Sequence, residues 1–165
     1  MGTGGDPAGA GPMGGGGTTI ASSTGPCLTV SFNLADDGGQ FGPRNIGAIW
    51  VTRGDGTYIR TLKVWANKRA KYLTHWLSAS GGDKVDAVTS ATMNSLGSRS
   101  VTWDCTDKTK ALVPEGDYLI HAEMTEDDAT GPSTVMTASL HPGAPFDQML
   151  GTDQNFLSRH LVHPP

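Results

Sequence analysis

The fold class is decided by residues 45–65, NIGAIWVTRGDGTYIRTLKVW. Two β-rich runs flank the tripeptide Gly-Asp-Gly, and glycine accepts the positive φ angles that a tight hairpin turn requires. The stretch therefore predicts a β-hairpin. Both faces of its first run carry apolar side chains, which is typical of a central strand covered on both sides: Ile46, Ala48 and Trp50 on one face, and Ile49 and Val51 on the other.

The segments around the hairpin have the same β character. In CLTVSFNL, residues 27–34, apolar and polar side chains alternate with the period of two that a half-buried strand requires. Further β-rich runs follow, separated by turn residues: RSVTWD at 99–104, DYLIHAEMTED at 117–127 and TVMTASL at 134–140. Regular strand spacing without a long helix predicts an all-β, immunoglobulin-like sandwich of about seven strands.

One segment departs from the strand pattern. Tyr72 and Trp76 lie four residues apart, and so do Leu73 and Leu77, which gives an apolar stripe at helical spacing. We expect a short helix over residues 69–78 that covers one end of the sandwich. His75 lies within this stripe, and we interpret it as a packed or solvent-facing residue rather than a ligand.

The chain divides into three parts by composition. Residues 1–26 are rich in Gly, Pro and Ala and too poor in apolar side chains to form a core, so we expect a flexible leader. Its composition suits a lipoprotein-like tether that holds an exported domain off a membrane or wall, and a terminus without a role is the alternative. Residues 27–140 form the predicted sandwich, and residues 141–165 form a tail that packs on the domain or on a partner.

Charge and hydropathy exclude two classes of partner. The formal net charge is -4, and the few basic residues do not gather into the patch that nucleic-acid binding requires. No run of about eighteen apolar residues exists that would form a transmembrane segment. We expect an extracytoplasmic protein, whether periplasmic, anchored at the outer surface or secreted, although no export signal is visible after Met1.

Cys27 and Cys105 lie far apart in the sequence, which excludes the short cysteine pairs of zinc and thiol redox motifs. In an exported protein they would form a disulfide that closes a long loop. Two unrelated buried thiols are the alternative.

Residues 100–123, SVTWDCTDKTKALVPEGDYLIHAE, resemble the ending of many bacterial immunoglobulin-like modules. That resemblance implies that Trp103 fills the core and that Tyr118 anchors a corner through its hydroxyl. Together with IGAIWVTRGDGTYIRTLKVW, YLTHWL and DAVTSAT, the order of features over residues 27–140 resembles the predicted periplasmic family known as domain of unknown function 2271.

The segment DAVTSAT, residues 86–92, has a second resemblance. It is similar to the motif of proteins that carry flavin mononucleotide (FMN) on a threonine, which a dedicated flavin transferase recognises. The resemblance implies that Thr92 is the FMN acceptor and Asp86 a recognition residue, with a small neighbour that lets the backbone come close. Ser90 stands where that motif has glycine. The candidate cofactor-binding residues are Asp86, Thr89, Ser90, Ala91 and Thr92.

A structural interpretation of the same segment stays open. Asp86 would then cap a turn, and the hydroxyls of Thr89, Ser90 and Thr92 would satisfy backbone groups in an exposed crossover.

Other chemistry has weaker support. His141, His160 and His163 would be metal ligands only if the fold gathered them, and the acidic run 126–128 lacks the ligand spacing of an EF-hand. The sequence contains no nucleophile motif. We therefore expect a protein without catalytic residues or a resident metal.

Two functions fit these observations. In the first, the protein is a non-enzymatic accessory of an extracytoplasmic redox or electron-transfer system, with FMN on Thr92 and a flavin transferase or redox protein as partner. The alternative is a structural or adhesive module, a subunit of a surface assembly whose edge strands and apolar tail bind a neighbour.

Overall fold

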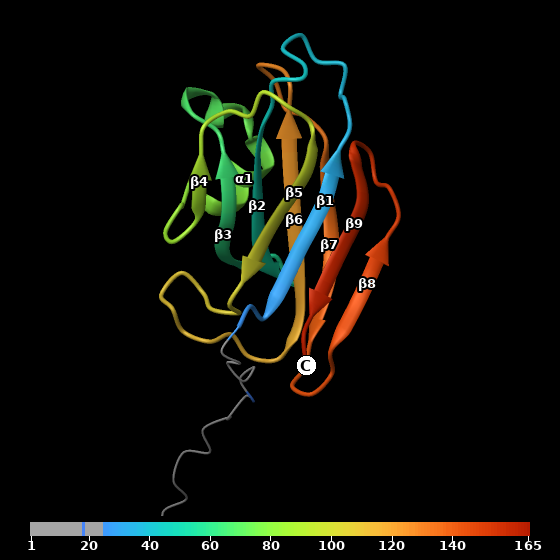
Figure 1. Cartoon of the computed structure of the whole chain (residues 1–165). Helices are drawn as coiled ribbons and strands as arrows, with labels where there is room; N and C mark the ends of the chain where they lie inside the picture. Colours follow the sequence, from blue (N-terminus) through green and yellow to red (C-terminus); the bar gives the residue numbers. More distant parts are fainter. Residues whose placement is uncertain (1–17, 19–24) are drawn as a thin grey trace, which may run out of the picture.

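The computed structural model describes Thr18 and residues 25–165, so the leader predicted over residues 1–26 lies almost entirely outside the described residues. Two sheets pack face to face (Figure 1). The four-stranded sheet has the order β5 (Gly97–Trp103), β1 (Leu28–Leu34), β9 (Phe156–His163), β8 (Phe146–Leu150). The five-stranded sheet has the order β4 (Val88–Ser90), β3 (Tyr58–Trp65), β2 (Ile46–Arg53), β6 (Gly116–Thr125), β7 (Ser133–Leu140). This architecture confirms the predicted all-β sandwich.

The predicted hairpin is present, and β2 is the central strand of its sheet. Strands β2 and β3 pair antiparallel, and the turn closes where the backbone N–H of Arg53 donates to the carbonyl of Thr57 at 2.9 Å. Every residue of β2 from Ile46 to Thr52 is buried. One face of the strand contributes to the core between the sheets, and the other lies under a helical segment. The apolar pattern on both faces is explained by this double coverage.

Two aromatic residues fix the end of the core, as the resemblance to immunoglobulin-like modules implied. The indole N–H of Trp103 donates to the carbonyl of Thr106 at 2.8 Å, and the ring meets Tyr118 edge to face with centroids 5.4 Å apart. The Tyr118 hydroxyl donates to the carbonyl of Pro114 at 2.6 Å. Buried Trp and Tyr side chains usually find such a partner for their polar atom, because an unpaired one would cost free energy.

The helical segment differs from its prediction in shape and in place. It consists of a 3-10 turn, η1 (Lys68–Tyr72), and a short α-helix, α1 (Thr74–Ser80), separated at Leu73 by a non-helical ψ of 71°. Leu73 and Trp76 are fully buried with Ile46, Trp50 and other residues of the outer face of β2 and β3. The segment therefore covers the outer face of the five-stranded sheet, and the prediction that it covers one end of the sandwich was wrong.

The C-terminal residues belong to the sandwich itself. Strand β9 pairs antiparallel with β1, and β8 pairs with β9, so the described residues form nine strands where about seven were predicted. Phe156 and Leu161 are completely buried. The alternation of β9 is broken at Ser158, which has a φ of 47°, beside a register shift against β1. This bulge explains why the sequence of β9 lacks the period of two.

Cys27 and Cys105 form the predicted disulfide, with their Cα atoms 5.6 Å apart. Cys27 precedes β1 and Cys105 follows β5, and these two strands are neighbours in which Leu28 is opposite Trp103. The bond therefore joins the ends of two paired strands in one sheet. It closes a loop with a sequence separation of 78 residues.

Candidate functional site

The segment 86–92 runs along the free edge of the five-stranded sheet. Strand β4 pairs with β3 in parallel through three residues only, with Val88 opposite Lys63 and Ser90 opposite Trp65. All three residues of β4 are exposed. In Figure 1, β4 lies at one margin of the sandwich and β8 at the other. A short edge strand held by few hydrogen bonds is the part of a sheet that another protein can approach most easily.

Ser90, which stands where the flavin-attachment motif has glycine, lies in extended backbone. It is a residue of β4, and it is not among the residues with positive φ. The backbone at this position therefore makes no demand for glycine. The side chain of Ser90 is exposed, and the segment accommodates it without strain.

The hydroxyls of Thr89, Ser90 and Thr92 have no protein partner among the described residues. Within the described residues, none of the three makes a hydrogen bond to the backbone or to another side chain. Thr92 is half-buried, and its neighbour Met93 is fixed by two backbone hydrogen bonds to Asn45, of 2.8 and 3.0 Å. Thr92 is thus a free hydroxyl on a segment fixed on its C-terminal side.

Asp86 is held differently, by two basic side chains. Its backbone is left-handed, with a φ of 57°, which Asp tolerates better than most residues. Its carbonyl accepts a hydrogen bond from the guanidinium of Arg60 at 3.1 Å, and its carboxylate lies 3.3 Å from the Lys110 ammonium. Asp86 therefore begins the exposed segment at a position that is fixed by charge.

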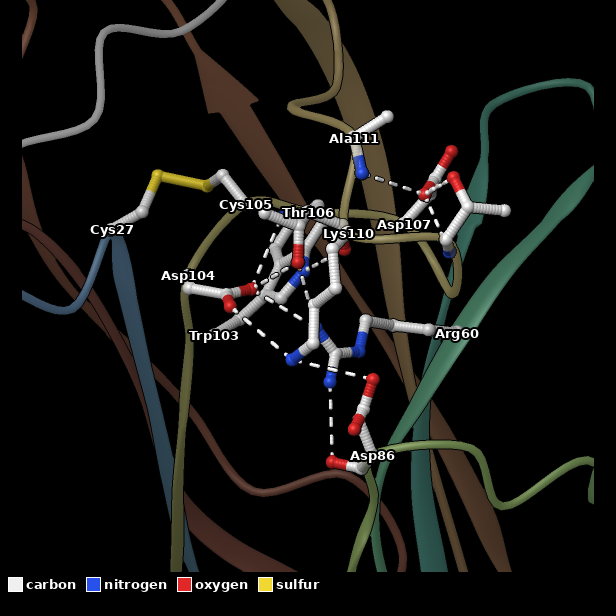
Figure 2. A network of polar contacts seen from close by, with 11 residues as sticks. Cys27, Arg60, Asp86, Trp103, Asp104, Cys105, Thr106, Asp107, Lys110 and Ala111 are labelled. Atoms are coloured by element: carbon white, nitrogen blue, oxygen red, sulfur yellow. Dashed lines mark hydrogen bonds and ion pairs between the residues drawn. A yellow bond between two sulfur atoms is a disulfide. The ribbon is translucent and has the colours of Figure 1, made fainter.

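Arg60 is the centre of this polar network, which Figure 2 shows beside the disulfide. The Arg60 side chain is 6% exposed, and one of its terminal nitrogens donates to Asp104 at 3.0 Å and to the Thr106 hydroxyl at 2.8 Å. Partial burial raises the pKa of Asp104, but the hydroxyl and amide of Thr106, followed by the charges of Arg60 and Lys110, outweigh it and hold that pKa below its ordinary value. The network thus joins two basic side chains, Arg60 and Lys110, to the carboxylates of Asp86 and Asp104.

Two hollows border the segment. The first, about 500 Å³, opens between the two sheets and combines the charged network with the apolar side chains of Leu62, Val88 and Trp103. The second, about 430 Å³, lies beyond β4 and is lined by Ala66, Asn67, Lys84, Thr89, Ser90 and Ala91. Of the five candidate residues, the structure places Asp86 at the first hollow and Thr89, Ser90 and Ala91 at the second, with Thr92 next along the chain.

The sequence did not indicate the part played by Arg60, Asp104 and Lys110. An arginine among the apolar residues of a strand signals a buried charge that needs a partner, and this signal was present at Arg60. It does not identify the partner, because Asp104 and the Asp86 carbonyl reach Arg60 only through the pairing of distant strands.

The histidines have separate partners. His141 contacts Glu115, His160 contacts Asp147, and His163 contacts the carbonyl of Cys27. The ring of His75 is half-exposed and hydrogen-bonds through Nδ1 to Glu123 at 3.0 Å. No three His, Cys, Asp or Glu side chains of the described residues are grouped as metal ligands.

His121, on β6, lies in a different environment. Its ring stacks on Trp50 with centroids 5.0 Å apart, and its Nε2 lies 2.9 Å from the Thr52 hydroxyl. Burial lowers the pKa of His121 below its ordinary value of 6.5. This imidazole is therefore neutral in the folded protein at neutral pH.

The fold and this site define a disulfide-bonded β-sandwich with an exposed, hydroxyl-bearing edge strand. Residues 28–146 match the model of the family described as "Predicted periplasmic protein (DUF2271)", and the chain belongs to that family. Neither the curated proteins nor the solved structures gave a match to the chain. Among the described residues, no helix is long and apolar enough to cross a membrane.

Proposed function

We propose that this chain is an extracytoplasmic accessory of an electron-transfer system, without catalytic turnover of its own, and that it carries FMN covalently on Thr92. The observation that carries the proposal is the placement of residues 86–92. They combine an exposed edge strand, unbonded hydroxyls and an anchored aspartate on one short segment. A protein-modifying enzyme needs such a segment, because it must take the acceptor hydroxyl into its own active site.

In the transfer of FMN, this chain supplies only the acceptor hydroxyl and the segment that the transferase recognises. The Thr92 oxygen attacks the phosphorus of a flavin mononucleotidyl donor, the bond from that phosphorus to its leaving group breaks, and the hydroxyl proton passes to a base of the transferase. This chain supplies a free nucleophile and a recognisable approach to it. Asp86, fixed by Arg60 and Lys110, is the recognition residue at the other end of the segment. When bound, FMN supplies one-electron and two-electron redox chemistry.

Ser90 is compatible with this assignment. The extended backbone at Ser90 and its exposed side chain support the view that serine replaces glycine here without changing the path of the segment. The structural alternative for the loop receives less support, because the hydroxyls that would satisfy backbone groups make no such hydrogen bonds within the described residues.

The adhesive alternative loses its main argument. It relied on edge strands and an apolar tail that bind a neighbour, whereas Phe156 and Leu161 of that tail are buried in the sandwich through β9. The edge strands are the features that still favour it.

The experiment is co-production of the chain in an export compartment with a flavin transferase of the class that modifies such motifs. Flavin fluorescence that stays with the denatured protein on a gel is the expected result. Thr92→Ala should abolish it, Thr89→Ala should retain it, and Ser90→Gly should retain or increase it. Fluorescence that survives Thr92→Ala, or its absence from both the natural chain and Ser90→Gly, would refute the proposal.

A further inference from the structure

A hollow of about 260 Å³ is lined by side chains from the β1–β2 loop, from η1 and from the β6–β7 connection. Its lining consists of basic and aromatic residues with one carboxylate: Phe41, Arg44, Lys68, Arg69, Lys71, Tyr72 and Asp128. Four of these residues are Lys or Arg, whereas the chain as a whole has a formal net charge of -4. This basic hollow therefore concentrates positive charge on an acidic protein.

Arg69 connects the three segments that line the basic hollow. Its Nε donates to the Asp128 carboxylate at 2.8 Å, and one terminal nitrogen donates to the carbonyl of Asp127 at 2.7 Å. Its guanidinium also lies over the ring of Phe41, 4.6 Å from the centroid, which is a favourable cation–π arrangement. The other terminal nitrogen makes no hydrogen bond within the described residues, so Arg69 presents fixed N–H donors that still lack an acceptor.

A tight turn brings Arg44 to the same hollow. The backbone N–H of Arg44 donates to the carbonyl of Phe41 at 2.9 Å, and the next residue, Asn45, is buried and pairs through its backbone with Met93. The turn is therefore held against the body of the sandwich. The Arg44 side chain is exposed, and among the described residues it forms no ion pair.

Two lysines of η1 complete the positive charge. Lys68 and Lys71 are exposed, and neither forms an ion pair within the part of the chain that the structure describes. The Lys71 ammonium lies 5.0 Å from the ring centroid of Tyr72. Since Asp128 already pairs with Arg69, the lining contains three cations without a carboxylate partner. A concave surface with an excess of one sign of charge focuses the electric field and raises the local concentration of opposite ions.

We infer that the basic hollow binds the phosphate group of a phosphate monoester. Guanidinium and ammonium groups bind phosphate through charge-assisted hydrogen bonds. At pH 7 a phosphate monoester carries about 1.5–2 negative charges, so three unpaired cations favour it over a carboxylate with its single charge. The volume is below the roughly 300–1,000 Å³ of sites that enclose a drug-sized ligand, so the phosphate enters the hollow and the rest of the molecule extends into solvent.

The test is isothermal titration of the full chain, produced without a flavin transferase, with glycerol 3-phosphate at pH 7.5. We expect one saturable site with a Kd of about 0.1–1 mM, typical of a small ligand held by a few charged groups. Glycerol and sodium acetate, titrated in parallel, should bind at least about tenfold more weakly, because they lack the double charge. An increase in sodium chloride from about 0.05 M to about 0.5 M should weaken binding at least about fivefold.

Variants of the exposed cations locate the site without disturbing the core. Arg44→Gln, and the double variant Lys68→Gln with Lys71→Gln, should each raise the Kd for glycerol 3-phosphate at least about fivefold. Arg53→Gln is the matched control, because Arg53 is also exposed but does not line the hollow. It should leave the Kd within about twofold of the natural chain, which separates a local site from an effect of net charge.

A second measurement distinguishes a soluble ester from a lipid headgroup. The chain is sedimented with phosphatidylcholine vesicles, with and without phosphatidic acid, whose headgroup is a phosphate monoester. Sedimentation that requires phosphatidic acid and is reduced in Arg44→Gln assigns the phosphate to a membrane lipid. Sedimentation with neither kind of vesicle, together with binding of glycerol 3-phosphate, assigns it to a soluble ester. Both results support the inference.

Three results would overturn the inference. The first is no saturable binding of glycerol 3-phosphate up to about 10 mM, which is well above the expected Kd. The second is an affinity for acetate equal to that for glycerol 3-phosphate. The third is a Kd that stays unchanged both in Arg44→Gln and in the double lysine variant. The titration uses unmodified protein, so its outcome does not depend on whether Thr92 carries FMN.

Discussion

The guanidinium of Arg60 donates to the backbone carbonyl of Asp86 at 3.1 Å, and the same side chain donates to Asp104, which directly follows β5 of the opposite sheet. One buried arginine on β3 therefore connects the start of the candidate modification segment to the end of β5. The segment is exposed along β4, but its first residue has a fixed position.

Arg60→Met is expected to destabilise the protein. It removes charge-assisted hydrogen bonds to Asp104 and Thr106, each worth roughly 1.5–3 kcal/mol, from a side chain that is almost fully buried. Because Asp104 is half-exposed and regains water, we expect a total loss of about 2–3 kcal/mol. Urea denaturation measures it, and Arg53→Met, on an exposed residue at the end of β2, is the control. Equal effects of the two substitutions would contradict the account.

Loss of the disulfide should lower the free energy of unfolding by more than Arg60→Met does. For a sequence separation of 78 residues, the chain-entropy model gives about 4–5 kcal/mol for the bond between Cys27 and Cys105. The double substitution to alanine, or reduction before denaturation, should lower the free energy of unfolding by that order. A change below about 1 kcal/mol would mean that the paired strands β1 and β5 hold the ends together without the covalent bond.

Tyr118→Phe tests the hydrogen bond that the Tyr118 hydroxyl donates to the carbonyl of Pro114. The substitution keeps the ring against Trp103 but leaves the carbonyl of Pro114 without its donor, and we expect a loss of about 1–2 kcal/mol. Tyr72→Phe is the matched control, since the Tyr72 hydroxyl makes no hydrogen bond within the described residues. Equal stability of the two variants in chemical denaturation would refute the predicted role of the hydroxyl.

The contribution of His121 to stability should fall as the pH drops below about 6.5, the ordinary pKa of histidine. Burial lowers the pKa of its imidazole in the folded protein, so the unfolded chain takes up a proton near the ordinary value of 6.5 while the folded protein does not. More protons bound in the unfolded state mean that stability is retained above that pH and lost as the pH falls toward the folded pKa.

His121→Phe isolates this contribution, because a phenyl ring can still stack on Trp50 and cannot titrate. The hollow beside His121 also contains His75 and Asp55, and Glu126 contributes with the opposite sign because its pKa is raised. Only the difference between the natural chain and the variant is therefore informative. Between pH 7.5 and 5.5, the free energy of unfolding should fall less steeply for His121→Phe than for the natural chain. Parallel curves for the two proteins would contradict the role assigned to His121.

The sequence predicted the parts of this fold that depend on local pattern. The hairpin at residues 45–65 has a turn with two glycines and clear apolar faces, and it is present in the structure. Strand β9 was not predicted, because a bulge at Ser158 interrupts its alternation. The helix was predicted as one piece, because spacing alone does not show that the backbone at Leu73 leaves the helical conformation.

The sequence also indicated only one part of the candidate site, the segment 86–92. The residues of the segment 86–92 are contiguous, so their motif could be recognised directly. Arg60, Lys110 and Asp104 come from three different places in the chain, and only the pairing of strands brings them to Asp86.

The most direct test of the central claim is a peptide mass map across residues 85–95 of the protein isolated from an export compartment that contains a flavin transferase. We predict a mass increase of one FMN minus water, with fragmentation that assigns the adduct to Thr92. A fully unmodified peptide, or an adduct on Thr89 or Ser90 instead, would contradict the assignment of Thr92 as the flavin anchor.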